Sequence, residues 1–235
     1  PTDDEHIFLS ADYSQIELRL MAHISDDAAM LEAFQRDEDI HSRTAAEVYG
    51  VKIEDVTPEM RRKAKITNFA VIYGVSAYGL SRQVELSVKE SAEFIDIYFQ
   101  RYPGVKKYME DVVKQAEEEG RVSTIFGRRR YIPDIKAKNR QVREFAKRAA
   151  INTPIQGSSA DIIKLAMIKI YNEFMSKGFR SKMTLQVHDE LLFDVFIPEL
   201  DEVKAVIKSG MENVADLKVP IKVEMGAGRN WLEAH

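Results

Sequence analysis

The chain has 235 residues, of which 45% are hydrophobic and 31% charged, enough apolar content for a folded core. It contains no cysteine, which excludes disulfides, thiolate metal sites and cysteine nucleophiles. No apolar run approaches the roughly 18 residues that a membrane span needs, and the first residues lack the order of a signal peptide. We therefore expect a soluble, intracellular protein without a membrane partner.

The net charge of −4 hides an uneven distribution. Residues 121–148 carry ten basic residues and two acidic ones, whereas the rest of the chain is acidic. Arg148, Asn152 and Gln156 then recur every four residues. Such a surface can follow the phosphates of a nucleic acid, or it can be an ordinary solvated helix face. Charge alone leaves both interpretations open.

Periodicity predicts sheet near both ends of the chain and helix between them. Residues 7–11 form a short apolar run, residues 183–197 indicate two strands around a turn at His188-Asp189, and another strand is expected at 219–225. Helical spacing runs through 16–24, 90–119, 141–152 and 159–177, with a break expected at Pro154. The predicted class is α+β, a small antiparallel sheet with a helical insertion.

The clearest predicted helix spans residues 58–74. Thr57 can cap it, Pro58 suits its first position and Gly74 should end it. One stripe of this helix carries two cations followed by two aromatic residues, Arg61, Lys65, Phe69 and Tyr73. The cations can bind a triphosphate and the aromatic rings a base or sugar. The same stripe could also be a solvated face whose rings dock on a neighbour.

Two carboxylates are expected at strand ends, Asp12 and Asp189. If their strands are neighbours, two such charges about 4 Å apart would repel by roughly 4 kcal/mol at an effective dielectric of 20. Paired Mg²⁺ ions would relieve this repulsion and are a common device of phosphoryl chemistry. Alternatively, Asp12 caps a helix and Asp189 fills a turn. Glu17 is equally open, since it could form a capping box with Ser14.

Three segments resemble the motifs of family A DNA polymerases, the family of bacterial DNA polymerase I. Residues 12–19 (DYSQIELR) resemble motif A, residues 61–74 (RRKAKITNFAVIYG) motif B and residues 186–190 (QVHDE) motif C. Further similar segments are Asp39-Ile40-His41, GRRR at 127–130 and the terminal residues 230–235. The order and spacing also match, and the resemblance runs from about residue 7 to the last residue.

The resemblance implies a right-hand polymerase fold, with a palm in two parts at 1–30 and 147–235, fingers at 31–146 and the thumb absent. It implies template-directed DNA synthesis, in which a primer 3′-hydroxyl attacks a dNTP and pyrophosphate leaves. The implied partners are primer-template DNA and dNTP, the cofactor is two Mg²⁺ ions, and the location is the bacterial cytoplasm in association with the nucleoid. The oligomeric state is left open.

The resemblance also implies roles for individual residues. Asp12 and Asp189 would bind the metal ions together with the backbone carbonyl of Tyr13, and Glu190 would be a secondary catalytic carboxylate. Lys65 would be the catalytic acid for the leaving pyrophosphate. The implied dNTP-binding residues are Gln15, Glu17, His41, Arg61, Lys65, Phe69 and Tyr73, with Glu17 as the steric gate against ribose. The implied DNA-binding residues are Arg148, Asn152, Gln156 and His188.

One residue departs from the family pattern, and three alternatives remain. Ala70 stands where the family usually has Gly, which bears on template-base entry but on no ligand role. A phage-type single-subunit RNA polymerase shares the motif B skeleton, although Glu17 and Phe69 favour DNA synthesis. A catalytically weak nucleic-acid-binding fragment needs only the basic stretch. A metal-dependent nuclease or phosphatase would leave the stripe of helix 58–74 unexplained.

Overall fold

The computed structural model describes residues 1–234, which form two compact units. Unit 1 joins residues 1–17 to the segment from Ser159 onward, and unit 2 is Leu18–Ser158. Helices α1 (Ile16–Ser25) and α8 (Arg140–Lys177) each continue from one unit into the other. The boundaries between the two units therefore lie inside helices, and no linker marks them in the sequence. The assignment of 1–30, 31–146 and 147–235 to palm and fingers stays a prediction.

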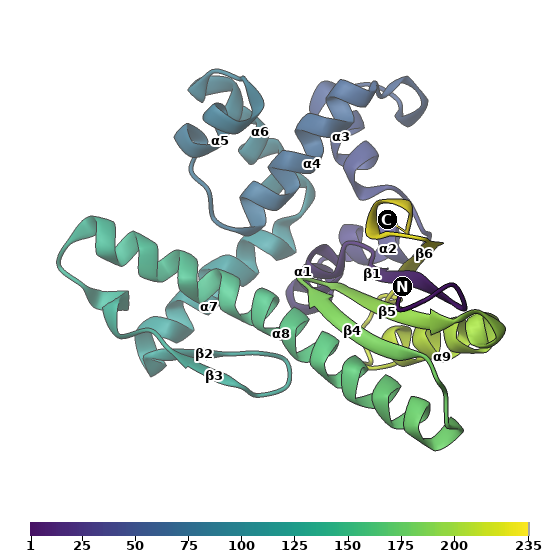
Figure 1. Ribbon diagram of the computed structural model, residues 1–235. Helices are drawn as coiled ribbons and strands as arrows, with labels where there is room; N and C mark the ends of the chain where they lie inside the picture. The colour runs from purple at the N-terminus through teal and green to yellow at the C-terminus, as the bar shows by residue number, and fades with distance from the viewer. Residues whose placement is uncertain (235) are drawn as a thin grey trace. The chain divides into compact units, whose positions relative to one another are not determined.

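Unit 1 is built on a four-stranded antiparallel sheet with the order β4-β5-β1-β6 (Figure 1). The predicted small sheet and its hairpin around His188-Asp189 are confirmed. The strand expected at 219–225 is wrong in position, because Pro220 cannot donate to a ladder and β6 begins only at Val223. The strands are β1 (His6–Tyr13), β4 (Lys182–Val187), β5 (Glu190–Phe196) and β6 (Val223–Gly228).

Helix α9 (Leu200–Glu212) packs against this sheet, and the second half of α8 contacts both β5 and α9. Phe174 of α8 contacts Phe193 of β5, with ring centroids 5.9 Å apart. A Cβ on Gly210 would lie 2.6 Å from Cγ1 of Ile170, so glycine permits the close approach of α9 to α8. The short elements of unit 1 are η3 (Ile197–Glu199) and α10 (Trp231–Ala234).

Unit 2 is mostly helical, and α4 lies beside α3 in it (Figure 1). Its helix α4 confirms the predicted cap, since Thr57 Oγ1 accepts from the Met60 N–H at 3.2 Å and Pro58 takes the first position. The helix ends at Ile72, and Gly74 has a φ of +69°. The helices of unit 2 before the hairpin are α2 (Ala28–Gln35), α3 (Ile40–Tyr49), η1 (Ile53–Asp55), α4 (Pro58–Ile72), α5 (Ala77–Val84), α6 (Val88–Arg101) and α7 (Pro103–Glu119).

A β-hairpin and the first half of α8 complete unit 2. The hairpin consists of β2 (Arg121–Ser123) and β3 (Arg129–Tyr131), and η2 (Pro133–Lys136) connects it to α8. The helical pattern at 90–119 corresponds to two helices, because Pro103 starts α7 directly after α6. The basic stretch at 121–148 thus covers the hairpin and the start of α8.

The break expected at Pro154 is wrong, because α8 is one continuous helix of 38 residues. Side chains satisfy backbone groups around the proline: Ser158 Oγ donates to the Pro154 carbonyl and Thr153 Oγ1 donates to the Ala149 carbonyl at 2.6 Å. Arg128 of the hairpin also donates to the Gly157 carbonyl at 2.9 Å. These contacts hold the helix turns on both sides of the proline, which has no N–H to donate. Although α8 is long, no helix within residues 1–234 is apolar enough to cross a membrane.

Candidate functional site

Asp12 and Asp189 lie at the same end of two neighbouring strands in unit 1. Asp12 is opposite Glu190 in the β1–β5 ladder, and the Tyr13 N–H donates to the Asp189 carbonyl at 3.3 Å. The sequence left open whether the strands that carry these two carboxylates are neighbours, and the pairing of β1 with β5 shows that they are. His188, in the turn before Asp189, has a φ of +53°, and Gln186 Nε2 donates to its carbonyl at 3.0 Å. The hydrogen bonds from Gln186 and from the Tyr13 N–H hold the turn, and the His188 side chain is exposed.

Glu190 is buried in unit 1 and has two defined donors. Ser10 Oγ donates to Glu190 Oε1 at 2.6 Å, and the Trp231 indole Nε1 donates to the same oxygen at 3.0 Å. Sequence reasoning missed both donors. Ser10 could have been found, because side chains two apart on a strand share a face and Ser10 precedes Asp12 by two. Trp231 is far away in sequence, so only the fold shows its contact.

The ligand set at this sheet end fits Mg²⁺ in its chemistry. Within residues 1–234, no group of three or more His, Asp or Glu side chains is arranged to hold a metal ion. Mg²⁺ does not require one, because it usually keeps several waters and is bound by one or two carboxylates plus substrate phosphates. Two carboxylates, Asp12 and Asp189, with the adjoining Tyr13 backbone, match the protein's share of such a site.

A strained turn connects β1 to α1 beside Asp12. Gln15 has a φ of +54°, a left-handed conformation that costs a residue with a side chain roughly 1–2 kcal/mol. Such strain is concentrated at functional sites. Because Gln15 is not helical, Ser14 is not the N-cap of α1, which counts against the capping-box alternative for Glu17. Glu17 instead lies half-buried in the first turn of α1.

In unit 2, the stripe on α4 is accessible as predicted. Arg61 and Lys65 are exposed, and Phe69 and Tyr73 are half-buried. Arg61 Nε donates to Asp39 Oδ2 at 2.5 Å, which leaves its two Nη groups available for other acceptors. Burial favours the neutral acid at Asp39, but the hydrogen bonds from Arg61 and Ser42 lower its pKa. The Asp39 carboxylate thus orients one cation of the stripe.

His41 is buried in unit 2 near the cations of α4. Burial lowers its pKa to about 4, because desolvation disfavours the imidazolium; Asp39 opposes this effect, whereas Arg61 and Lys65 add to it. His41 is therefore neutral near pH 7. Its Nδ1 lies 3.0 Å from Asn68 Nδ2, and its ring lies 5.9 Å from that of Phe69. The structure thus brings His41 into the electrostatic reach of both predicted phosphate-binding cations.

Arg148, Asn152 and Gln156 lie on one side of the continuous helix α8. Arg148 and Gln156 are exposed, and Asn152 is half-buried. The end of α4 reaches this helix within unit 2, since a Cβ on Gly74 would lie 3.4 Å from Arg148 Cγ. The polar side of α8 and the aromatic end of the α4 stripe are therefore close together.

Each unit contains its own part of the predicted site residues. The residues in unit 1 are Asp12, Tyr13, Gln15, Glu17, His188, Asp189 and Glu190. The residues in unit 2 are His41, Arg61, Lys65, Phe69, Tyr73, Arg148, Asn152 and Gln156. Unit 1 thus contains the carboxylates, and unit 2 contains the cations and the aromatic rings.

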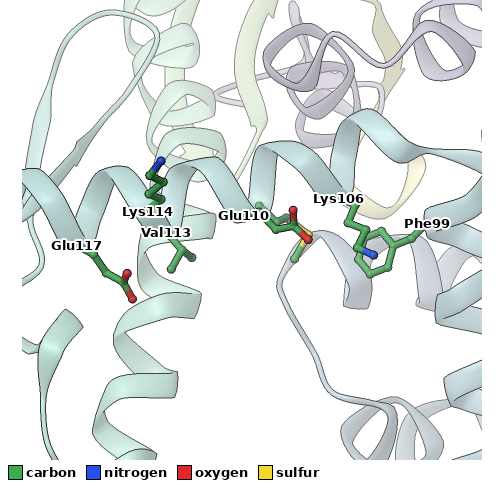
Figure 2. Close-up of a pocket in the computed structure, with 7 residues that line it drawn as sticks. Phe99, Lys106, Glu110, Val113, Lys114 and Glu117 are labelled. Atoms are coloured by element: carbon green, nitrogen blue, oxygen red, sulfur yellow. The ribbon is translucent and has the colours of Figure 1, made fainter.

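A pocket on the outside of α7 contains none of these residues (Figure 2). Its volume is about 430 Å³. Phe99 and Lys106 lie together at one end of it, and lysine and glutamate alternate along α7. Because the charges are mixed, the lining selects neither an anion nor a cation. This pocket therefore gives no reason to look for the site away from the sheet end of unit 1 and from α4 and α8 of unit 2.

A small antiparallel sheet with paired carboxylates and a helical unit with a cationic and aromatic stripe define the palm and fingers class of polymerase folds. The POL domain of Pol1 from M. smegmatis, solved in complex with DNA primer-template and dNTP, matches with a TM-score of 0.95 and 48% identity. That match covers 99% of this chain and 41% of the solved chain. The fold class expected from the sequence is thus confirmed.

The chain belongs to DNA polymerase family A, whose profile matches residues 1–233. It is 55% identical to DNA polymerase I of Caldicellulosiruptor bescii over 228 residues, which is 97% of this chain and 27% of that protein. It is 50% identical to DNA polymerase I of Lactococcus lactis subsp. lactis over 235 residues, again 27% of that protein. The chain thus spans about a quarter of these relatives. Both relatives are DNA polymerases by name.

Proposed function

We propose that the chain carries out template-directed DNA synthesis. A bond forms between the primer 3′-oxygen and the α-phosphorus of a dNTP, and the bond from that phosphorus to the β-phosphate bridging oxygen breaks. Pyrophosphate leaves, and a base takes up the proton of the 3′-hydroxyl. The partners are primer-template DNA and dNTP, and the work is done in the bacterial cytoplasm at the nucleoid. Family membership and the neighbour's complex with primer-template and dNTP support this proposal.

The unit 1 residues hold the reacting groups in this proposal. Asp12, Asp189 and the Tyr13 carbonyl would hold two Mg²⁺ ions, which would activate the attacking oxygen and stabilise charge on the leaving one. The buried carboxylate of Glu190 stands opposite Asp12 and adds negative charge to the same sheet end. His188 contacts the primer from the adjoining turn. Glu17 occupies the space that a ribose 2′-hydroxyl needs, so it favours deoxyribose.

The unit 2 residues bind and orient the nucleotide and the DNA. Arg61, Lys65 and His41 contact the phosphates, and Lys65 gives a proton to the departing pyrophosphate. Phe69 and Tyr73 lie against the sugar and base, while Gln15 contacts the new base pair from unit 1. Arg148, Asn152 and Gln156 contact the primer and template. The exposure of Arg61 and Lys65 supports the phosphate-binding roles of these two cations.

The observation that carries the proposal is the contact between Tyr13 and Asp189, which fixes motif A beside motif C. The test is primer extension by the parent chain and by Asp189→Asn, with Mg²⁺, a primed template and either dNTPs or rNTPs. We expect dNTP incorporation by the parent and a loss of at least about 10³-fold in the variant, which keeps the shape but loses the charge. Asp216→Asn, at an exposed position of unit 1, is the matched control and should retain full activity.

Three other results would overturn the proposal. Equal activity in Asp189→Asn and Asp216→Asn would remove the metal role from the sheet end. Selective uptake of rNTPs would support the RNA polymerase alternative. No synthesis by a folded parent that still binds primed template would leave a nucleic-acid-binding fragment, for which the basic stretch at 121–148 is sufficient.

A further inference from the structure

Asn68 and His41 form a buried polar pair inside unit 2. Asn68 lies on α4 and His41 on α3, and their side chains meet with Nδ2 and Nδ1 3.0 Å apart. Asn68 is 1% exposed and His41 is 2% exposed. Asn68 is absent from the predicted site residues, although it lies between Lys65 and Phe69 in sequence.

The chemistry of the pair decides where the imidazole proton lies. An amide nitrogen donates hydrogen bonds and cannot accept them, so Asn68 Nδ2 donates and His41 Nδ1 accepts. A ring nitrogen that accepts carries no proton. Because burial keeps His41 neutral near pH 7, its one ring proton is on Nε2.

We propose that Asn68 is a positioning residue that holds His41 in the tautomer with its proton on Nε2, so that His41 can donate to a nucleotide phosphate. This inference rests on the proposed function for the ligand, but not for the tautomer. Phosphate oxygens only accept hydrogen bonds, so the opposite tautomer would turn a lone pair toward them. The Asn68 bond therefore decides whether a neutral histidine at this place attracts or repels the substrate.

The other side of the Asn68 amide supports a positioning role over a purely structural one. Within residues 1–234, Asn68 Oδ1 is buried and has no hydrogen-bond partner. A buried unpaired carbonyl costs about 1–3 kcal/mol, which an apolar residue of similar size would avoid. The oxygen of the amide thus gives no reason for asparagine here. Its N–H bond to His41 gives one.

The direct test is the protonation state of the His41 ring in solution. The chain has five histidines, His6, His23, His41, His188 and His235, so long-range ¹H–¹⁵N spectra of the labelled chain near pH 7 are simple, and His41→Gln identifies the His41 signals. We expect the proton on Nε2 in the parent. A proton on Nδ1 of the parent would overturn the proposal without any variant having to fold.

Asn68→Asp is the matched variant, because a carboxylate has nearly the same shape but only accepts. We expect a proton on His41 Nδ1 in this variant, while the other histidines and the Trp231 indole signal keep their positions. If Nδ1 stays unprotonated in a folded Asn68→Asp chain, Asn68 does not control the tautomer and the proposal is wrong.

A kinetic cycle tests the consequence for the nucleotide. Asn68→Asp should raise the KM for dNTP in the parent about tenfold more than the same substitution raises it in a His41→Gln background. We expect kcat to change by less than about threefold, because the lost contact binds the substrate equally in the ground state and the transition state. Equal increases in both backgrounds would mean that Asn68 acts independently of His41. If the parent incorporates no nucleotide at all, the proposed function fails, and the spectra still decide the tautomer.

Discussion

The backbone N–H of Tyr13 donates to the backbone carbonyl of Asp189 at 3.3 Å, which joins two segments that are 176 positions apart in the chain. This contact extends the β1–β5 ladder by one residue beyond Asp12 and Glu190. It holds both predicted metal-binding carboxylates at one end of the sheet. A backbone contact does not depend on side-chain identity, so substitutions of the carboxylates should leave the sheet intact and remove chemistry alone.

Glu17→Ala should weaken the discrimination against ribonucleotides. The smaller side chain leaves room for a 2′-hydroxyl, so the kcat/KM ratio of rNTP to dNTP should rise by about 10²-fold, the scale at which a pocket separates substrates by size. Single-nucleotide insertion measures this ratio. Glu17→Gln keeps the size and should stay close to the parent. An equal rise in both variants would assign selectivity to the charge of Glu17 rather than its volume.

Trp231→Phe should destabilise unit 1, because it removes the indole N–H from the buried carboxylate of Glu190. Ser10 remains as a donor, so we expect the free energy of unfolding to fall by about 1–2 kcal/mol in urea titrations. Leu232→Ala is the control, since Leu232 is 89% exposed and its change should stay within about 0.5 kcal/mol. Matching results for the two variants would mean that the indole contact contributes no stability.

Ser158→Ala should destabilise unit 2 around Pro154. Ser158 Oγ donates to the Pro154 carbonyl and accepts from the Ile125 N–H at 3.0 Å, and the side chain is fully buried. Losing both bonds should lower the free energy of unfolding by about 2 kcal/mol. Ser159→Ala changes a neighbouring half-buried serine and should cost less than about 0.5 kcal/mol. Equal costs for the two serines would show that Ser158 does not support the helix at the proline.

Acid should destabilise the fold through His41. Its pKa is about 4 in the folded chain, below the ordinary value of 6.5, so between these values the unfolded chain binds a proton that the folded chain does not. The stabilising contribution is therefore complete above pH 6.5 and is lost as pH falls toward 4, by about 3 kcal/mol in total. Urea titrations across this range should show a smaller pH dependence for His41→Gln than for the parent. The same slope in both would contradict the buried, neutral histidine.

Much of this protein is determined locally by its sequence. A short apolar run predicts β1, and two apolar segments around the polar turn at His188-Asp189 predict the β4–β5 hairpin, because both signals lie within a few neighbouring residues. Thr57, Pro58 and Gly74 predict α4 to within two residues, since capping needs only neighbours along the chain. The stripe from Arg61 to Tyr73 follows from helical geometry. The three motif segments identify the family, because their spacing is itself a property of the sequence.

Tertiary structure alone decided the features that depend on distant partners. The hairpin holds α8 beside Pro154, since Arg128 donates to the Gly157 carbonyl and the Ile125 N–H donates to Ser158, and no local rule predicts these contacts. The indole of Trp231 reaches Glu190, and the amide of Asn68 reaches the ring of His41, across chain separations of 41 and 27 residues. Local periodicity carries no information on such pairs, because a hydrogen bond depends on distance in space and not on position in the chain.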